Sequence, residues 1–299
     1  MGVILEKIIS VIDIGSNTVK LVIYKYKNGK LIPKYTQSIY LRLFNYLIKS
    51  NSPHGEKLII SKKGISKTKE VLEHFKKEVD EYKPDKLIAF ATYVIRVADN
   101  KDEFLNEMKD YFDIRILSEQ EEAYYSAYGA LLNINLESGI ICDMGGGSLE
   151  VCSVKNNDIE HCNSYPLGTL YFKDFFPDGI LINEEGARNK IRKFIKKPSQ
   201  NFETMVGVGG SIRALSKITH KKKIEKTVLD KTLNKIKNMT PNEISEKYMI
   251  SERRSETVVS AALAMSELMN IYGCKTLYIS KYGIREGIIL KLLLNGEKP

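Results

Sequence analysis

The sequence predicts an α/β protein of two domains, each of which begins with the same strand–loop–strand unit. The chain has 299 residues, which at roughly 100–200 residues per domain favours two domains. An apolar run, a glycine-bearing turn and a second apolar run occur at residues 8–26 and recur at residues 139–154. Asp13 and Asp143 close the first run of each unit and are 130 positions apart. We interpret this as a weak internal repeat of two domains, 1–123 and 124–299.

The first domain is expected to begin with a three-stranded antiparallel meander and to continue with alternating helices and strands. Asn28 and Gly29 separate the second and third runs with the turn chemistry of a β-hairpin. Apolar residues then recur at helical spacing until Pro84 stops the helix. The expected elements are strands at 8–14, 19–26 and 31–35, a helix at 64–82, a strand at 86–91, a helix at 102–112, a strand at 114–117 and a helix at 119–132.

The second domain restarts this pattern with two strands around a glycine turn. A later strand passes through a second glycine turn into a helix, and a long helix rich in Ala and Met follows. The expected elements are strands at 139–143, 149–154 and 204–208, a helix at 212–218, a helix at 251–272, a strand at 277–280 and a final helix. We interpret the lysine-rich stretch 221–226 as a linker.

Charge and apolar content limit the classes of function. The chain carries 46 Lys and Arg against 37 Asp and Glu, a net charge of +9, which favours a polyanionic ligand. The same surplus is also typical of an ordinary lysine-rich surface. No run approaches ~18 uninterrupted apolar residues and no cleavable signal is apparent, so we expect a cytoplasmic protein without membrane contact. The four cysteines match no zinc spacing, and Cys142 is expected to be a buried small apolar residue.

Three glycine-bearing loops are candidates for binding phosphate. Glycine lets backbone N–H groups approach an anion because no Cβ stands in the way. Each loop alone could be an ordinary turn, but two of the three stand at matching positions of the repeat. The loops are Gly15-Ser16-Asn17-Thr18, Gly145-Gly146-Gly147-Ser148 and Gly209-Gly210-Ser211, the last at a helix N-terminus. P-loop, nucleophile-elbow and dinucleotide-binding motifs do not occur in the sequence.

Two aspartates end buried strands just before these loops. Asp13 and Asp143 either hold a divalent cation against phosphate or cap their own turns, and Asp143 is the stronger candidate. Glu150 follows Ser148 on the same strand face, which makes it a second candidate metal ligand.

Other charged residues are candidates for proton transfer and for clamping phosphate. A capping box with Ser118 accounts for Glu121, which leaves Glu122 as a candidate general base for water. Arg96 and Arg285 either clamp phosphate oxygens or form surface ion pairs.

Eight stretches of the chain resemble the motifs of one family, in that family's order and over nearly the whole length. The chain resembles the exopolyphosphatase / guanosine pentaphosphate phosphohydrolase (Ppx/GppA) family of the actin-like ATPase superfamily. The matching stretches are VIDIGSNT (11–18), FATYVIRVADN (90–100), ILSEQEEAYYSAYG (116–129), ICDMGGGSLE (141–150), YPLGT (165–169), VGVGGSIRAL (206–215), RSETVV (254–259) and YGIREG (282–287).

The resemblance implies two actin-like (ribonuclease H-like) domains flanking an active-site cleft, in a short two-domain form. It also implies hydrolysis of the terminal phosphate of inorganic polyphosphate, or of the 5′ phosphate of guanosine pentaphosphate, with Mg²⁺ or another divalent cation. Glu122 falls on the family's proposed general base, Asp143 and Glu150 on residues associated with metal and phosphate, and Arg96 on a phosphate contact. Departures from the family pattern include Thr18 and the bulky residues 93–95 before Arg96.

Four hypotheses remain open at this level. An exopolyphosphatase is favoured, with the net charge of +9 weakly preferring long polyphosphate. A guanosine pentaphosphate phosphohydrolase, a phosphate-chain or nucleotide sensor without turnover, and an actin-like kinase or ATPase are the alternatives. No specific nucleic-acid binding is expected, and the oligomeric state is left open, with a homodimer as one alternative.

Overall fold

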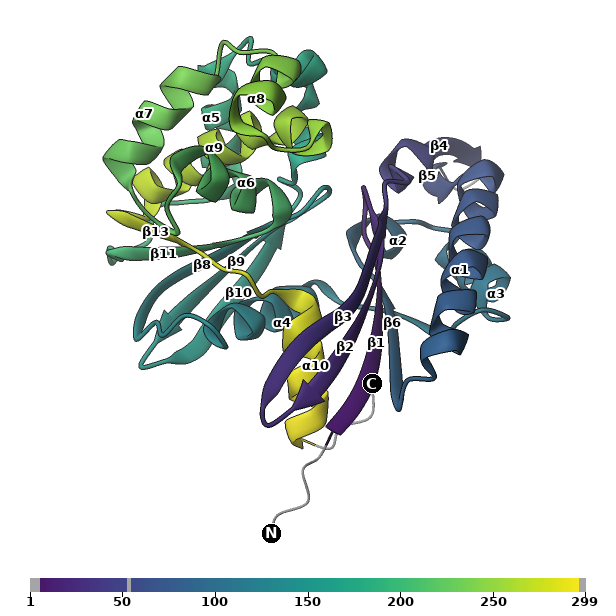
Figure 1. Cartoon of the computed structure of the whole chain (residues 1–299). Helices are drawn as coiled ribbons and strands as arrows, with labels where there is room; N and C mark the ends of the chain where they lie inside the picture. Colours follow the sequence, from purple (N-terminus) through teal and green to yellow (C-terminus); the bar gives the residue numbers. More distant parts are fainter. Residues whose placement is uncertain (1–5, 53–54, 296–299) are drawn as a thin grey trace. The chain divides into compact units, whose positions relative to one another are not determined.

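The structure is a computed structural model that describes residues 6–52 and 55–295. It confirms the predicted α/β class and forms two compact units, which divide between Glu119 and Gln120 and again between Ile288 and Ile289 (Figure 1). The first division lies slightly before the boundary predicted after residue 123, and the described residues from Ile289 to Asn295 go with the first unit. The domain bounds 1–123 and 124–299 stay a prediction.

The first unit contains a five-stranded sheet in the order β3-β2-β1-β6-β7. Its first three strands are antiparallel, while β6 is parallel to β1 and β7 is parallel to β6. The elements are β1 (Glu6–Ile14), β2 (Val19–Lys27), β3 (Lys30–Ile39), η1 (Leu43–Tyr46), β4 (Leu47–Ser52), β5 (Gly55–Ile60), α1 (Lys62–Tyr82), β6 (Lys86–Ala91), α2 (Tyr93–Arg96), α3 (Lys101–Met108) and β7 (Ile114–Ile116).

Buried isoleucines couple β1 to helix α1. Ile12 and Ile14 are fully buried in the same apolar cluster as Phe75 of α1. The helix begins where the Ser61 hydroxyl accepts a hydrogen bond from Gly64 N at 3.3 Å. It ends at Lys83, which adopts the left-handed conformation with φ 44°. Asp13, between the two buried isoleucines, therefore faces the other side of the sheet.

The second unit repeats this arrangement in a six-stranded sheet of order β10-β9-β8-β11-β13-β12. As in the first unit, three antiparallel strands, β8, β9 and β10, precede parallel ones, and β11 is parallel to both β8 and β13. The remaining elements of the chain are α4 (Glu119–Leu131), β8 (Ser138–Met144), β9 (Leu149–Lys155), β10 (Asp158–Tyr165), η2 (Thr169–Phe175), η3 (Pro177–Gly179), α5 (Glu184–Phe194), β11 (Thr204–Val208), α6 (Gly210–Thr219), β12 (Lys223–Glu225), α7 (Lys226–Ile236), α8 (Pro241–Tyr248), α9 (Glu252–Tyr272), β13 (Thr276–Ile279) and α10 (Ile284–Asn295). The division between the units falls within α10, after Ile288.

The two faces of the second sheet pack against different helices. Cys142 and Met144 of β8 belong to the cluster that contains α9, and Cys142 is fully buried as predicted. Ile141 belongs instead to a cluster with Ala123 and Ala127 of α4. Side chains alternate along a strand, so Asp143 lies on the face that α4 covers.

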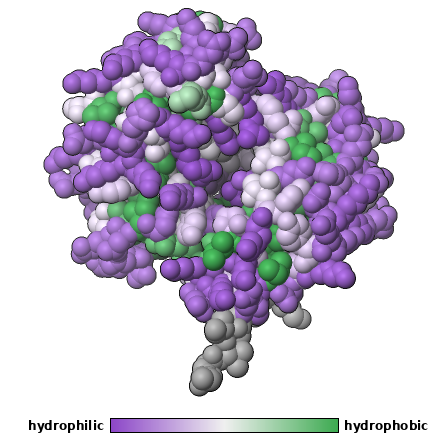
Figure 2. Space-filling model, in the orientation of Figure 1, coloured by the Kyte–Doolittle hydropathy of each residue, from purple (hydrophilic) through white to green (hydrophobic). Residues whose placement is uncertain are grey.

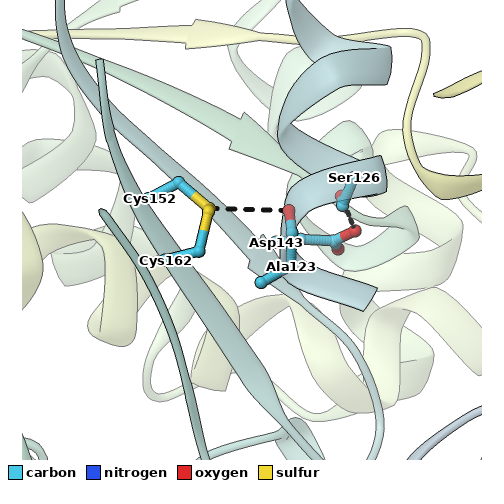
Figure 3. The surroundings of a disulfide bond; sticks show 5 residues. All are labelled: Ala123, Ser126, Asp143, Cys152 and Cys162. Atoms are coloured by element: carbon cyan, nitrogen blue, oxygen red, sulfur yellow. Dashed lines mark hydrogen bonds between the residues drawn. A yellow bond between two sulfur atoms is a disulfide. The ribbon is translucent and has the colours of Figure 1, made fainter. Parts of the chain in front are cut away.

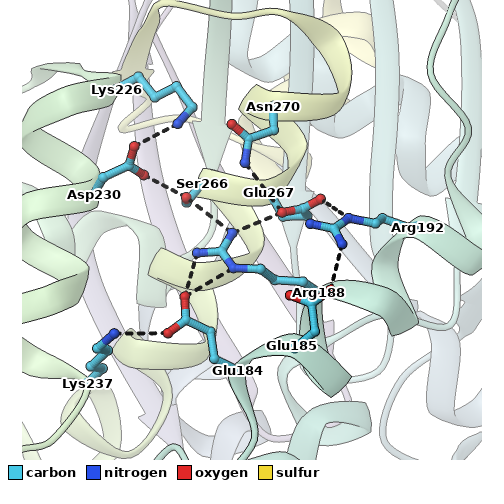
Figure 4. A network of polar contacts seen from close by, with 10 residues as sticks. All are labelled: Glu184, Glu185, Arg188, Arg192, Lys226, Asp230, Lys237, Ser266, Glu267 and Asn270. Carbon is cyan, nitrogen blue, oxygen red and sulfur yellow. Dashed lines mark hydrogen bonds and ion pairs between the residues drawn. The ribbon is translucent and has the colours of Figure 1, made fainter.

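A polar network joins α5 to α9 within the second unit (Figure 4). Glu267 of α9 has a side chain only 2% exposed, and it accepts hydrogen bonds from Arg188 Nη1 at 2.9 Å and Arg192 Nε at 2.6 Å. Burial by itself would raise the pKa of Glu267, but the hydrogen bonds from Arg192, Arg188 and Asn270 hold this pKa below its usual range. The paired carboxylate thus fixes α5 on α9.

The interpretation of residues 221–226 as a linker is wrong. Residues Lys223–Glu225 form β12, which pairs antiparallel with β13, and α7 begins at Lys226. Ile224 is fully buried, whereas the lysines around it stand at the sheet edge, where charged side chains discourage pairing with another chain. The helix predicted at 102–112 also ends earlier, at Met108.

The face of the molecule drawn in Figure 2 is mainly hydrophilic, with small and separate apolar areas. The described residues include scattered exposed apolar side chains, such as Ile182 and Met249. Among the described helices, none is both long enough and apolar enough to cross a membrane.

Candidate active site

The loop between β8 and β9 is held in place through its carbonyl groups. The turn closes with a hydrogen bond from Gly145 N to Ser148 O at 3.0 Å. The segment that enters η2 then donates three amides to the glycine carbonyls. These bonds run from Thr169 N to Gly145 O (3.0 Å), from Leu170 N to Gly146 O (2.9 Å) and from Gly168 N to Gly147 O (3.4 Å).

This arrangement fixes the direction of the loop's amides. All described peptide bonds of the chain are trans, and in a trans peptide the carbonyl and the following N–H point in opposite directions. The N–H groups of Gly146, Gly147 and Ser148 therefore point away from the segment 168–170. Consecutive amides aimed the same way form a concave surface that suits an anion.

Two carboxylates lie opposite each other where this loop meets the sheet. Asp143 and Glu150 are direct cross-strand partners of β8 and β9. Asp143 Oδ2 accepts a hydrogen bond from the hydroxyl of Ser126 in α4 (Figure 3). Glu150 Oε1 accepts a hydrogen bond from Ser164 Oγ at 2.9 Å. Both carboxylates are thus positioned by hydroxyl donors from neighbouring elements.

The surroundings of Glu150 disfavour its negative charge. Burial raises the pKa of Glu150 well above its usual value, and the negative charges of Glu122 and Asp143 raise it further. Hydrogen bonds from Ser148 and Ser164 act in the opposite direction. Glu122 is itself 9% exposed on α4, so three carboxyl groups share a largely buried region of the second unit.

This group of carboxyls fits a divalent cation that keeps most of its ligands as water or substrate oxygens. Within residues 6–52 and 55–295, no three His, Cys, Asp or Glu side chains are placed to hold one ion together. Mg²⁺ is commonly held by one or two carboxylates together with phosphate oxygens and water. Asp143 and Glu150 provide such a pair, and a cation beside them would relieve their mutual repulsion.

The third glycine loop lies beside the end of β8. Gly209 has φ 117°, and a Cβ there would lie 2.7 Å from Met144 O and 3.4 Å from Asp143 Oδ1. Only glycine is compatible with this conformation and this close approach. Ser211, in the first turn of α6, forms a hydroxyl–hydroxyl hydrogen bond of 2.7 Å with Thr257.

The segment around Arg285 also reaches this region. A Cβ on Gly283 would lie 3.9 Å from both Asp143 Oδ2 and Ser126 Oγ. Gly283 N donates to Glu286 Oε2 at 3.0 Å, which fixes the start of α10. Arg285 is therefore in the helical turn next to Asp143, and its side chain is partly buried.

The first glycine loop, in the first unit, has the same backbone construction. Gly15 N donates to Thr18 O at 3.1 Å, and the amides of Arg42 and Phe44 donate to the carbonyls of residues 17 and 16, each at 2.9 Å. The N–H groups of Asn17 and Thr18 consequently point away from the segment 42–44. Among the described residues, buried Asn17 Oδ1 accepts no hydrogen bond.

Charged residues near this first loop differ from those of the second. Asp13 lies directly opposite Lys20 across β1 and β2. Arg96 ends the short helix α2, where its Nη1 donates to Leu117 O at 3.0 Å and its guanidinium lies 5.9 Å from the ring centre of Tyr93.

The structure therefore gathers most of the predicted residues in the second unit. These are Glu122, Asp143, Gly145, Gly146, Gly147, Ser148, Glu150, Gly209, Gly210, Ser211 and Arg285. Gly15, Ser16, Asn17, Thr18 and Arg96 belong to the first unit.

Sequence reasoning assigned no role to several residues that shape the site. Gly168 and Arg254 lie in motifs that signalled the family, but the motifs alone did not say what they touch. A Cβ on Gly210 would fall 2.1 Å from Arg254 Cζ, so this guanidinium lies against the third loop. Ser126 and Ser164 were missed because a single serine carries no sequence signal of its partner.

Comparison with known proteins identifies the family. The model of the Ppx/GppA phosphatase family matches residues 22–296. The chain belongs to this family. A solved structure of the Aquifex aeolicus family member covers 99% of this chain and 100% of its own, with a TM-score of 0.82 and 24% identity, which confirms the fold.

Several relatives of this chain are named as phosphatases or pyrophosphatases. The Exopolyphosphatase 1 of Mycobacterium leprae is 25% identical over 95% of this chain and 89% of its own length. The guanosine-5′-triphosphate,3′-diphosphate pyrophosphatase of Pseudoalteromonas atlantica is 23% identical over 98% of this chain and 60% of its own. The bifunctional 3-dehydroquinate synthase/phosphatase of Fusobacterium nucleatum is 24% identical over 94% of this chain, which spans only 46% of that protein's length. The first two names describe enzymes that hydrolyse phosphoanhydride bonds.

Proposed function

We propose that the protein is an exopolyphosphatase, which releases terminal orthophosphate from inorganic polyphosphate by metal-assisted hydrolysis. The observation that carries the proposal is the β8–β9 loop, whose three consecutive amides point one way beside a group of carboxyls. Amides alone suit any anion, whereas carboxyls next to an anion site suit a reaction that needs both a cation and a base.

In this proposal the chain's own residues perform four tasks. The amides of Gly146, Gly147 and Ser148 bind oxygens of the terminal phosphate and stabilise charge in the transition state. Glu122 accepts a proton from the attacking water. The water oxygen bonds to the terminal phosphorus and displaces the shortened polyphosphate from it. Asp143 and Glu150 hold Mg²⁺ or another divalent cation, which neutralises phosphate charge when bound.

Further phosphate contacts are proposed in both units. Gly209, Gly210 and Ser211 offer a helix N-terminus, and Arg285 a guanidinium. From the first unit we propose the loop formed by Gly15, Ser16, Asn17 and Thr18, together with Arg96. The unsatisfied Oδ1 of Asn17 supports a ligand at that loop, because buried polar atoms are normally hydrogen-bonded.

A second candidate substrate is guanosine pentaphosphate, which would lose its 5′ phosphate at the same site. The name of the Pseudoalteromonas relative favours it. The net charge of +9 favours the longer polyanion. The cytoplasmic location, the absence of nucleic-acid binding and a homodimer stay predictions.

One assay separates these alternatives. Phosphate release is measured with Mg²⁺ from polyphosphate of several lengths, from guanosine pentaphosphate and from ATP. The proposal expects the highest kcat/KM with polyphosphate. A higher value for guanosine pentaphosphate would assign the second substrate, and binding without any released phosphate would make the protein a sensor. Faster hydrolysis of ATP that polyphosphate does not suppress would favour the kinase or ATPase hypothesis.

A further inference from the structure

A disulfide bond crosses the hairpin that carries Glu150. Cys152 of β9 and Cys162 of β10 are direct cross-strand partners, bonded through their sulfurs with a Cα–Cα separation of 4.1 Å (Figure 3). The other two cysteines, Cys142 and Cys274, are free and buried. The sequence did not predict this bond, because a ten-residue spacing of cysteines has no meaning until the strand register is known.

The disulfide neighbours the hydrogen bond that positions Glu150. Side chains two residues apart on a strand share a face, so Cys152 lies on the same face as Glu150, and Cys162 on the same face as Ser164. Ser164 Oγ donates to Glu150 Oε1 at 2.9 Å. The covalent bond and this hydrogen bond are thus successive cross-links on one face of the same two strands.

The disulfide also contacts the helix that carries Glu122. Cys152 Sγ lies 3.5 Å from the carbonyl oxygen of Ala123, the residue that follows Glu122 in α4. A disulfide sulfur has no proton to donate to this oxygen. A Cys152 thiol would have one, so the surroundings accommodate the reduced state as well as the oxidised state.

Of the two bonded cysteines, Cys162 is the more exposed to external thiols. Cys162 is only partly buried and lies on β10, the edge strand of its sheet, whereas Cys152 is 1% exposed. A thiolate attacks Cys162 Sγ, the S–S bond breaks, and Cys152 Sγ leaves and takes up a proton. A second thiol then releases Cys162. In total, two small thiols become one small disulfide, and the protein gains two thiols for two electrons.

We propose that Cys152 and Cys162 form a thiol–disulfide switch that controls turnover by setting the position of Ser164 against Glu150. In the oxidised state the bond ties β10 to β9 beside the two hydroxyl-bound carboxylates. In the reduced state the sulfurs separate to non-bonded distance. β10 has only one neighbouring strand among the described strands of its sheet, so it moves more easily than β9, and Ser164 moves with it. The hydrogen bond to Glu150 is then weakened and turnover falls.

The proposal rests on the proposed function for its activity readout, but not for its structural readout. The full chain is equilibrated in ratios of oxidised to reduced dithiothreitol, and free thiols are alkylated in denaturant and counted by mass. At each ratio, hydrogen exchange is measured across Asp158–Tyr165, together with phosphate release from polyphosphate. Reduction is expected to speed exchange in β10 and to lower phosphate release about tenfold, the scale of one hydrogen bond to a charged group.

Three variants sharpen the test. The double variant Cys152→Ser/Cys162→Ser should match the reduced protein at every ratio. Ser164→Ala keeps the disulfide but should show the lower turnover in both states, since the hydroxyl through which the switch acts is gone. Cys274→Ala, which removes a buried thiol outside the pair, should keep the full response.

Several results would overturn the switch. The first is that reduction of the wild-type protein leaves hydrogen exchange in β10 unchanged. The second is that an active enzyme releases phosphate equally fast in the oxidised and reduced states. The third is that the tenfold change in phosphate release persists in the double variant or in Ser164→Ala. Chemical reduction of the wild-type protein supplies the first two even if a variant does not fold. If neither state releases phosphate, the proposed function fails, and the exchange measurement alone decides the switch.

Discussion

The β1–β2 hairpin of the first unit and the β8–β9 hairpin of the second have the same backbone and different electrostatics. Each loop closes with one amide-to-carbonyl bond, at 3.1 Å in the first and 3.0 Å in the second, and a following 3-10 segment binds the loop carbonyls. Across the strands, however, Asp13 faces Lys20, whereas Asp143 faces Glu150. Both loops present backbone amides that suit an anion, but only the second hairpin places two carboxyl side chains opposite each other.

The difference extends to what covers each hairpin. In the second unit α4 brings Glu122 close enough to Glu150 to raise the pKa of that carboxyl. In the first loop the carbonyl of Asn17 accepts a hydrogen bond from the amide of Arg42, a residue in the left-handed conformation with φ 52°. In the second loop the matching carbonyl, that of Gly147, accepts from the amide of Gly168. We therefore expect the chemistry at the second hairpin and phosphate positioning alone at the first.

The largest expected effect tests the chemistry at the second hairpin. Glu122→Gln keeps the size of the side chain and removes the base, so kcat for phosphate release should fall by roughly 10²–10⁴. The control is Glu119→Gln, an exposed glutamate in the first turn of the same helix, which should leave kcat nearly unchanged. Near-wild-type turnover of Glu122→Gln would remove the general-base role.

The matched pair Asp143→Asn and Asp13→Asn tests the electrostatic contrast directly. Asp143→Asn should weaken the apparent Mg²⁺ affinity by about 10–100-fold, since the second hairpin then loses one of its two paired carboxylates. Asp13→Asn should change it less than about threefold, because Lys20 already faces that carboxylate. Mg²⁺ titrations of phosphate release measure both. Equal effects would mean that the two aspartates have equivalent roles.

Gly168→Ala tests how closely the second loop is held. A Cβ at Gly168 would lie 2.3 Å from Gly146 O, so the loop or η2 must shift, and the free energy of unfolding should fall by about 1–3 kcal/mol. Gly145→Ala is the comparison, because its nearest neighbour, Ser148 O, would be at 3.5 Å. Urea denaturation of both variants and of the wild type measures the free energies of unfolding. A Gly168→Ala protein as stable as the wild type would show that the loop is not tightly packed.

The smallest effect concerns the pH dependence of stability. Burial and the charges of Glu122 and Asp143 raise the pKa of Glu150, so the folded protein binds this proton more tightly than the unfolded chain does. The pKa of a glutamate in the unfolded chain is about 4.3. As the pH rises above this value, the free energy of unfolding therefore falls until the pH exceeds the raised pKa of Glu150 in the folded protein. Glu150→Gln removes this loss, so its free energy of unfolding in EDTA should fall less from pH 4 to pH 8 than that of the wild type.

Denaturation series at several pH values provide the measurement for this last prediction. The control is Glu160→Gln, an exposed glutamate on β10, which should keep the wild-type slope. If the free energy of unfolding of Glu150→Gln varies with pH as steeply as that of the wild type, the pKa of Glu150 is not raised by folding. The two hairpins would then differ less in their electrostatics than their sequences suggest.

Local patterns in the sequence were sufficient to predict the repeated strands around both glycine loops, while the roles of the candidate site residues stay predictions. Residues 204–208 were predicted as a strand and form β11, and residues 139–143 were predicted as a strand that ends at Asp143 and lie within β8. The strand β12 and the helices α5, α7 and α8 were not predicted. A three-residue strand is too short for periodicity to be visible, and β12 exists because Ile224 completes the core beside β13.

By itself, the sequence determined the α/β class, the two matching glycine loops, the family and the aspartate that ends the strand before each loop. These follow from local rules: glycine permits turns that other residues resist, and side chains alternate along a strand. Only the tertiary structure decided which way the amides of the second loop point, because the segment 168–170 that orients them comes twenty residues later. It also decided that Cys152 is bonded to Cys162 and that Glu122 lies near enough to Glu150 to raise its pKa, since strand register and helix packing, rather than neighbours in the chain, set these positions.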